Sequence, residues 1–434
     1  MHRVTSIAVV FAAGSVMADL PTPVTDADYR AVDMDQVTLG QMLFYDPILS
    51  GNRNISCGTC HHPKHATADG VALSLGEGGI GLGPERRADP ANLPEQRIPR
   101  NAPALFNLGA YEFSVMFHDG RIEVDPDKTG GLRTPMGAEM TAGFASLLSA
   151  QTMFPVLSAD EMAGHYSENE VSKAVRQGRI TGQGGAWDLL ARRVNEATGY
   201  APLIEKAFGA GHAVSFTDIS DAIAEFIAFE WRSDGSAFDA HLRGVAPLTG
   251  KAAEGLDLFY GSAGCADCHG GPFQTDHAFH AAGVPQFGPG KAARFEDHAR
   301  DLGRMRVTGR MEDAYAFRTP SLRNVAMTGP YGHTGSHADL SDFLADHAAP
   351  ATALDRFDLE EVYLPDLPVS DDWHLVRPDE QVALQQAVTI HPVSLSTSDI
   401  DALVAFLETL SDPVAVAGRL GLPDAVPSGL PVDR

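Results

Sequence analysis

Basic residues are scarce in this chain. Its 434 residues include 32 lysines and arginines against 57 aspartates and glutamates, which gives a formal net charge of -25. Because nucleic-acid binding needs clustered lysine and arginine side chains to neutralise phosphates, this balance argues against nucleic acid as a partner. It also disfavours adsorption to an anionic membrane surface and is compatible with a cationic or neutral protein partner, while leaving the oligomeric state open.

Long apolar stretches are also missing. Beyond the N-terminus, no run reaches the roughly 18 apolar residues that a membrane-spanning helix needs. The apolar run Ile7–Val16 is shorter, follows the basic start Met1–Arg3, and ends at the small-x-small site Val16-Met17-Ala18. These features are typical of a secretory signal peptide rather than of a buried first helix. We therefore predict that residues 1–18 are removed and that the mature protein is soluble and periplasmic.

Cysteines are few, and their spacing is specific. In an exported chain four cysteines would suggest two disulfides, but Cys57/Cys60 and Cys265/Cys268 form two Cys-x-x-Cys pairs followed at once by His61 and His269. The halves of a zinc ribbon lie much closer together, and redox dithiols need no following histidine. Cys-x-x-Cys-His attaches c-type haem, because the thiols reach two vinyl groups and the histidine reaches the iron. We predict two covalently bound haems.

Strand-like alternation is rare, whereas apolar residues recur at helical spacing over 39–45, 168–177, 186–208, 218–231, 251–260, 338–348 and 399–410. The last of these helices is expected to begin with a capping box at Ser398 and Asp401. The sequence predicts a mainly α protein with long ordered loops. Two helical units, 19–240 and 241–434, each enclose one haem and are joined by a linker helix. The C-terminal tail is a candidate to pack back on the first unit.

A glycine-rich segment, Gly76–Gly81, matches Gly-x-Gly-x-x-Gly. A dinucleotide site would need a strand before it and a helix after it, but Pro84 follows and no strand pattern precedes. We interpret it as a loop that passes close to the first haem.

Besides the two haem motifs, six segments stand out along the chain: Leu39–Asp46, Arg100–Pro103, Phe117–Arg121, Asp160–Met162, Phe317–Asn324 and Pro330–His333. In this order they resemble the bacterial di-haem cytochrome c peroxidase and MauG family. The resemblance runs from about residue 38 to 410 and implies two cytochrome c-like domains, with a peroxide-reacting haem in the first and an electron-supplying haem in the second.

His61 and His269 are the expected proximal ligands, and the resemblance bears on the opposite face of each iron. In the peroxidases of this family, a histidine sixteen positions after the first proximal histidine can cap the first haem. Here that position holds Glu77, which resembles the MauG branch and implies an open or weakly water-ligated first haem. On the alternative interpretation, Glu77 is a solvated loop residue with no role at the haem.

Peroxide cleavage needs a group that moves a proton between the two oxygens. Glu161 matches the catalytic glutamate of the family, and Gln151 matches a distal glutamine that can hydrogen-bond a bound oxygen ligand. Taken alone, Glu161 would be an ordinary charge at a helix N-terminus.

The second haem departs from the family pattern. The family's distal ligand, methionine in the peroxidases and tyrosine in MauG, falls on His347 here. His347 also shares the apolar face of the helix predicted at 338–348. His333, His337 and Met327 are rival ligands. Because a second imidazole lowers the potential of a haem relative to methionine, this departure favours a MauG-like enzyme over a detoxifying peroxidase.

Three further assignments follow from the resemblance. His118 stands between the haems, where the family commonly has an electron-relaying tryptophan. Arg318 matches an arginine near the second haem, where it would contact a propionate. The family also holds a calcium ion between the haems, and the matching ligands are Asn101, Thr328 and Pro330.

Together these features predict a periplasmic enzyme that reduces hydrogen peroxide at the first haem with electrons relayed through the second, supplied by a small electron-donor protein. The alternative is a MauG-like enzyme that uses peroxide and high-valent haem to modify a partner protein. A third hypothesis is a non-enzymatic di-haem electron carrier, which would need protein ligands on both faces of each iron. The absence of a histidine near Glu77 argues against it.

Overall fold

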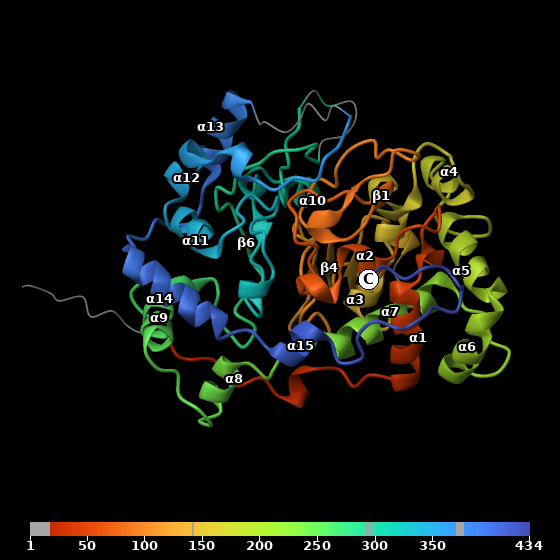
Figure 1. Cartoon of the computed structure of the whole chain (residues 1–434), viewed down its shortest axis with the longest axis horizontal. Helices are drawn as coiled ribbons and strands as arrows, with labels where there is room; N and C mark the ends of the chain where they lie inside the picture. Colours follow the sequence, from red (N-terminus) through yellow and green to blue (C-terminus); the bar gives the residue numbers. More distant parts are fainter. Residues whose placement is uncertain (1–17, 141–142, 292–295, 297, 370–376) are drawn as a thin grey trace, which may run out of the picture.

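The computed structural model describes residues 18–140, 143–291, 296, 298–369 and 377–434. The predicted signal peptide lies almost entirely outside these residues. In Figure 1, helices α1 to α7 gather on one side of the molecule, and α9 and α11 to α14 gather on the other. The protein is mainly helical, as predicted, and its few strands form short antiparallel pairs.

The first half contains seven helices and five of the short strands among its described residues. The helices are α1 Met34–Tyr45, α2 Cys57–Cys60, α3 Leu147–Thr152, α4 Glu170–Arg176, α5 Ala186–Glu196, α6 Ala201–Phe208 and α7 Phe216–Glu230. The strands are β1 Gly79–Ile80, paired with β2 Arg87–Ala88, and the sheet of β3 Val115–Met116, β4 Ile122–Val124 and β5 Leu132–Arg133.

The second half contains the remaining elements. Its helices are α8 Ala237–Leu242, α9 Lys251–Phe259, α10 Met305–Thr308, α11 Leu340–Ala348, α12 Pro350–Arg356, α13 Pro378–Ala387 and α14 Thr397–Glu408. Strand β6 Phe279–His280 pairs with β7 Phe317–Arg318. Helix α15 Pro413–Ala417 begins the C-terminal tail.

Two local predictions need correction. The single helix expected at 186–208 is two helices, α5 and α6, separated by a turn at Thr198–Tyr200. The capping box of the last helix lies two residues earlier than predicted: the Ser396 hydroxyl accepts the Asp399 N–H and donates to the Asp399 carboxylate at 2.7 Å. The helix therefore begins at Thr397, and Ser398 lies inside it.

Helix α7 is a core helix and not a linker. Its apolar face was predicted correctly, since Ile219, Ile223 and Phe226 are buried, but this face packs against α1 within the first half. The chain instead crosses between the halves in the non-helical segment Arg232–Ser236. Phe238, just after the crossing, already belongs to the second hydrophobic core.

The same helix crossing occurs once in each half. A Cβ atom on Gly40 of α1 would lie 1.9 Å from the Ala222 carbonyl oxygen of α7, so the two backbones are in direct contact. A Cβ atom on Gly255 of α9 would lie 1.9 Å from the Ala402 carbonyl oxygen of α14. In both halves, only glycine permits so close an approach of the two helices.

A second feature is also repeated in the two halves, close to the end of the later helix of each packed pair. Asn107 and Asn324 both have left-handed backbones, with φ of 60° and 62°. The Asn107 N–H donates to the Trp231 carbonyl at 3.1 Å, and the Asn324 N–H donates to the Leu410 carbonyl at 3.1 Å. Each asparagine ends a Pro-x-Leu-x-Asn string, at 103–107 and 320–324, which is a sequence repeat that the motif analysis missed.

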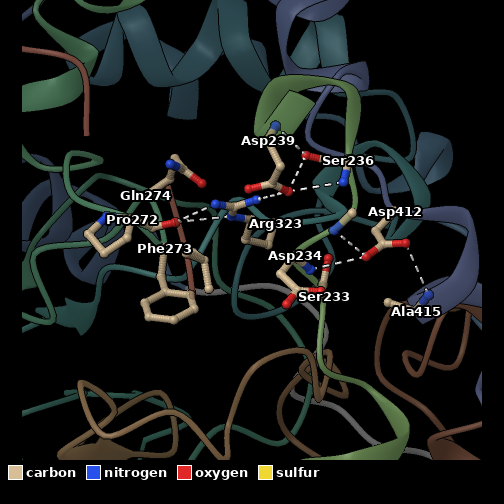
Figure 2. Close-up of polar contacts among 12 residues, drawn as sticks. Ser233, Asp234, Ser236, Asp239, Pro272, Phe273, Gln274, Arg323, Asp412 and Ala415 are labelled. Atoms are coloured by element: carbon tan, nitrogen blue, oxygen red, sulfur yellow. Dashed lines mark hydrogen bonds and ion pairs between the residues drawn. The ribbon is translucent and has the colours of Figure 1, made fainter. Parts of the chain in front are cut away.

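A buried polar cluster fixes the crossing segment (Figure 2). Arg323 pairs with Asp239 at 2.7 Å, both side chains are fully buried, and the same guanidinium donates to the Pro272 carbonyl. Asp412 accepts the backbone N–H of Gly235 at 2.8 Å. These contacts hold the start of the second half and the start of the C-terminal tail to one another.

The first and the last described segments each contact the opposite half. The Ala18 N–H donates to the Tyr260 carbonyl, beside the second haem motif. The C-terminal tail runs back to α1 and α2, where Figure 1 places the C-terminus. There Ser428 donates to Asp46 at 2.7 Å, and Thr59, inside the first haem motif, donates to Asp433 at 2.5 Å.

Among the described residues, no helix combines the length and the apolar character needed to cross a membrane.

Candidate haem and peroxide sites

The first haem motif forms the short helix α2, and His61 caps its C-terminal end. The His61 Nδ1 lies 2.8 Å from the carbonyl oxygen of Thr67, whose own φ is 64°. Burial lowers the pKa of His61 and favours the neutral ring. A neutral imidazole that donates from Nδ1 keeps Nε2 as a lone-pair ligand, which is the orientation a metal-binding histidine needs.

The second motif repeats this arrangement. Cys265 opens a short turn, and the His269 Nδ1 lies 3.3 Å from the carbonyl oxygen of Gln274, whose φ is 49°. All four cysteines are unpaired. Each half therefore presents two free thiols and one oriented imidazole, the donor set of a covalently attached haem.

His347 faces His269 across the second site. The two ring centres are 6.4 Å apart. An imidazole nitrogen binds a transition metal at about 2 Å, so two imidazoles on opposite sides of one iron hold their ring centres about 6 Å apart. Burial, together with the neighbouring His269, lowers the pKa of His347 to about 4 and keeps the ring neutral. The pair fits an iron capped on both faces.

The rival ligands are placed less well. Both ring nitrogens of His337 are engaged, with Ser336 at 2.8 Å and Asp346 at 3.0 Å. Met327 has 52% of its surface exposed. His333 is buried and stacks on Phe317, with ring centres 3.8 Å apart. The groups whose charges act on its pKa include His118 and Arg100 of the first half.

The residues expected on the distal side of the first haem lie in α3 and in a single π-helical turn, Ala159–Ala163. Gln151 lies near the end of α3, and its Oε1 is buried without a hydrogen-bond partner. Glu161 lies in the π-turn. Burial raises the pKa of Glu161, and the positive charges of Lys291 and Arg121 partly oppose this rise.

Lys291 is a charged residue near Glu161 that the sequence analysis missed. It belongs to the second half, and burial together with Arg121 and Arg100 lowers the pKa of its amine. The adjacent loop reaches the first half, because Phe287 packs with Ala72 and Leu73. No local motif marks a residue that acts on a site in the other half of the chain.

Glu77 is fully buried, so its interpretation as a solvated loop residue is wrong. Its Oε1 accepts three side-chain amides, from Asn52 at 2.8 Å, Asn54 at 2.7 Å and Asn92 at 2.8 Å. The neighbouring glycine-rich loop folds round the buried Arg86 guanidinium, which donates to the carbonyls of Gly76 and Gly81 at 2.7 Å. Because these carbonyls point inward at a cation, the loop does not form a phosphate cradle.

Arg318 and His118 lie together between the halves. The Arg318 N–H donates to the His118 carbonyl at 2.8 Å, and the His118 Nε2 lies 3.2 Å from the Asn101 carbonyl oxygen. Burial lowers the pKa of His118 to about 4. The Arg318 guanidinium donates to backbone carbonyls, and burial alone lowers its pKa to about 10. A buried guanidinium bonded to neutral carbonyls suits an anionic haem propionate as its partner.

Two of the three expected calcium ligands contact one another. The Asn101 Nδ2 donates a hydrogen bond to the Pro330 carbonyl at 2.7 Å, and the Asn101 Oδ1 is buried without a hydrogen-bond partner. Thr328 directly follows the turn Val325–Met327, two residues before Pro330. Calcium takes oxygen ligands, so ligation by this pair would need the Asn101 amide turned to present Oδ1 instead of Nδ2 beside the Pro330 carbonyl.

Comparisons with known proteins identify relatives of the whole chain. A family model described as di-haem cytochrome c peroxidase matches residues 34–246. The chain is 30% identical over 338 residues to cytochrome c551 peroxidase of Nitrosomonas europaea, covering 77% of this chain and 79% of that protein. It is 28% identical over 387 residues to the methylamine utilization protein MauG of Methylorubrum extorquens, covering 88% of this chain and 80% of that protein.

The fold has solved counterparts. The di-haem peroxidase BthA of Burkholderia thailandensis superposes with a TM-score of 0.59 at 21% identity, covering 99% of this chain and 100% of that one. The fold, the doubled haem motif and the relatives define a haem-dependent oxidoreductase with two c-type haems. The chain belongs to the di-haem cytochrome c peroxidase family, which confirms the resemblance.

Proposed function

We propose that the protein is a periplasmic enzyme that reduces hydrogen peroxide at the first haem, with electrons that enter through the second. The observation that carries this proposal is the difference between the two distal faces. His347 stands opposite His269 with ring centres 6.4 Å apart, whereas the first half offers Glu161 and Gln151. When bound, the first haem supplies an iron with a free position for peroxide, and the second supplies electrons.

Glu161 is the proposed acid–base group. Its carboxylate accepts the proton of the incoming peroxide and returns it to the departing hydroxide, which leaves as water. Burial raises the pKa of Glu161 and favours the proton-carrying form, while Lys291 and Arg121 keep the ionised form accessible. The Oε1 of Gln151 has no hydrogen-bond partner in the protein, and we assign it to accept a hydrogen bond from the O–H of the incoming peroxide.

His61, Cys57 and Cys60 hold the first haem in this proposal, and His269, Cys265, Cys268 and His347 hold the second. Arg318 binds a propionate, and Asn101, Thr328 and Pro330 hold a calcium ion between the haems. His118 occupies the route between the two sites as a neutral imidazole. We place the domain boundary at the Arg232–Ser236 crossing, slightly before residue 240.

The second candidate is a MauG-like enzyme that uses peroxide to oxidise residues of a partner protein. The His269–His347 pair favours it, because two imidazoles lower the potential of a haem and make it a poor acceptor from a high-potential cytochrome. Both candidates share the chemistry at the first haem and differ in what is oxidised. The buried Glu77, at the position where a capping histidine would stand, argues against a simple electron carrier.

One set of measurements tests these assignments. Low-temperature electron paramagnetic resonance of the oxidised holoprotein should give one high-spin and one low-spin haem signal. Stopped-flow mixing with hydrogen peroxide should then perturb the high-spin species. Rapid peroxide loss with reduced cytochrome c supports the peroxidase, whereas slow loss with a long-lived oxidised species supports the MauG-like enzyme. Two low-spin signals and no reaction with peroxide would overturn both.

A further inference from the structure

Glu77 is a buried carboxylate to which the proposed peroxide chemistry assigns no step. It is 0% exposed, and its hydrogen-bond partners are side-chain amides, not cations. Three amides converge on one oxygen, Oε1. A buried acceptor with this many hydrogen bonds is expensive to lose, because its removal leaves several buried donors unpaired.

The three amides come from two parts of the first half. Asn52 and Asn54 lie in the segment that leads into the Cys57 attachment motif, and Asn92 lies in the loop beyond β2. Asn52 is also hydrogen-bonded to Asn169, because its Oδ1 accepts a hydrogen bond from the Asn169 side-chain amide at 3.0 Å. The Asn169 amide also donates to the Ala163 carbonyl at the end of the π-turn, at 2.9 Å. Glu77 is thus the point at which these segments meet.

Glu77 also contacts the turn that carries Glu161. Its backbone N–H donates to the Asp160 carbonyl at 2.9 Å. A Cβ atom on Gly76 would lie 2.1 Å from the same carbonyl oxygen and 2.9 Å from the Glu161 Cα. The backbone at Gly76–Glu77 therefore lies directly against the backbone of Glu161, and any displacement of this loop would change the support of that residue.

We infer that Glu77 is a positioning residue: its carboxylate, held by Asn52, Asn54 and Asn92, fixes the loop 74–79 against Asp160–Glu161. These hydrogen bonds keep Glu161 in one place and keep loop residues away from the first iron. The peroxide site is therefore complete in the oxidised protein without a prior rearrangement. This inference rests on the proposed function, because Glu161 is the acid–base group there.

Two substitutions at Glu77 separate hydrogen bonding from mere space filling. Glu77→Gln keeps an oxygen for the three amides, whereas Glu77→Leu has a similar size and no acceptor. In the di-haem holoprotein we expect Glu77→Leu to slow the peroxide reaction at least tenfold and to raise amide hydrogen exchange in peptides covering 74–79 at least tenfold. Glu77→Gln should stay within threefold of the parent in both measurements. The low-spin signal of the second haem should be unchanged in each variant.

A double variant, Asn54→Ala with Asn92→Ala, removes two of the amides that donate to Glu77 and leaves Glu77 itself in place. It replaces Glu77→Leu as the test if that variant fails to take up haem. It should lower the peroxide rate at least threefold and raise exchange at 74–79. The matched control is Asn195→Ala, which removes an asparagine bonded to Ala191 and Val214 away from this loop and should leave the peroxide rate within twofold.

Two results would overturn the inference: parental rate and exchange in Glu77→Leu, or equal losses in Glu77→Gln and Glu77→Leu. A parent protein inert to peroxide would instead refute the proposed function, and the exchange comparison would still decide whether Glu77 holds the loop.

Discussion

The two halves share a scaffold and differ at the face where chemistry would occur. Each has a glycine-mediated helix crossing, at Gly40 and at Gly255, and each has a proximal histidine bonded to a left-handed residue's carbonyl. The difference lies opposite that histidine. The second half places His347 on a regular helix, whereas the first half places Glu161 on a π-turn supported by the Glu77 loop.

On the proposed function, the scaffold sets where a haem sits, while the distal segments set what the haem can do. A helix that presents an imidazole would cap the iron and suit electron transfer. A π-turn that presents a carboxylate would supply a proton carrier to a small oxidant. Substituting one distal residue at a time, in the first half or in the second, should therefore reduce the difference between the two sites.

The largest effect is expected at Glu161. Glu161→Gln removes the proton carrier but keeps the side-chain size, so the peroxide reaction should slow by about 10²- to 10⁴-fold. Stopped-flow absorbance after mixing with hydrogen peroxide measures this rate, and the haem content should equal that of the parent. A parental rate would exclude Glu161 from the proton transfer.

His347→Gly should make the second site resemble the first. Removal of the imidazole opposite His269 leaves one protein ligand, so the low-spin resonance signal should convert completely to high-spin. Added imidazole should restore the low-spin signal, because it can occupy the vacated space. His337→Gly is the matched control and should leave the spectrum unchanged, since both nitrogens of that ring are bonded to protein groups. The opposite pattern would identify His337 as the ligand.

The repeated helix crossing can be tested with two matched substitutions. Gly40→Ala and Gly255→Ala each place a methyl group 1.9 Å from a backbone carbonyl oxygen, so the helices must separate. We expect each to cost about 3 kcal/mol of unfolding free energy in its own half. Thermal melts monitored at the high-spin and low-spin haem bands report the halves separately. If each variant lowered the stability reported by both haem bands equally, the two helix pairs would not stabilise their halves independently.

Much of the scaffold could be predicted from the sequence, because it depends on local patterns. The haem motifs, the buried face of α7 and the helix carrying His347 all follow from spacing within a few turns. The role of α7 did not follow, since an apolar face does not reveal which element covers it. The break between α5 and α6 was missed because the apolar pattern continues through the turn at Thr198–Tyr200.

The parts of the site that the sequence did not reveal depend on contacts between distant segments. Glu77 is charged and lies in a glycine-rich loop, which locally indicates exposure, and only its meeting with Asn52, Asn54 and Asn92 explains its burial. Lys291 is likewise an isolated lysine in a loop of the other half. Besides the doubled haem motif, the repeated Pro-x-Leu-x-Asn string was a second signal in the sequence that the two halves share a plan.

The smallest effect concerns the contact between the halves. Arg100 of the first half holds Asp301 of the second through two hydrogen bonds, at 2.6 and 2.8 Å, and both side chains are buried. Burial tends to raise the pKa of Asp301, but the Arg100 guanidinium outweighs burial and lowers it from 3.8 to about 2. The folded state therefore binds this proton less readily than the unfolded state does. Asp301 contributes stability above pH 4 that is lost as the pH falls toward 2.

The lowered pKa corresponds to about 2 kcal/mol of unfolding free energy at neutral pH. Asp301→Asn should remove this pH-dependent contribution, so its unfolding free energy should fall less steeply than that of the parent between pH 4 and pH 2. Denaturant titrations at several pH values measure both slopes, and Asp366→Asn, a control for general charge effects, should retain the parental slope. Because Arg100 also binds Asp119 at 2.8 Å, the variant keeps one ion pair and should still fold. Parallel curves for parent and variant would show that the two halves are held together by other contacts.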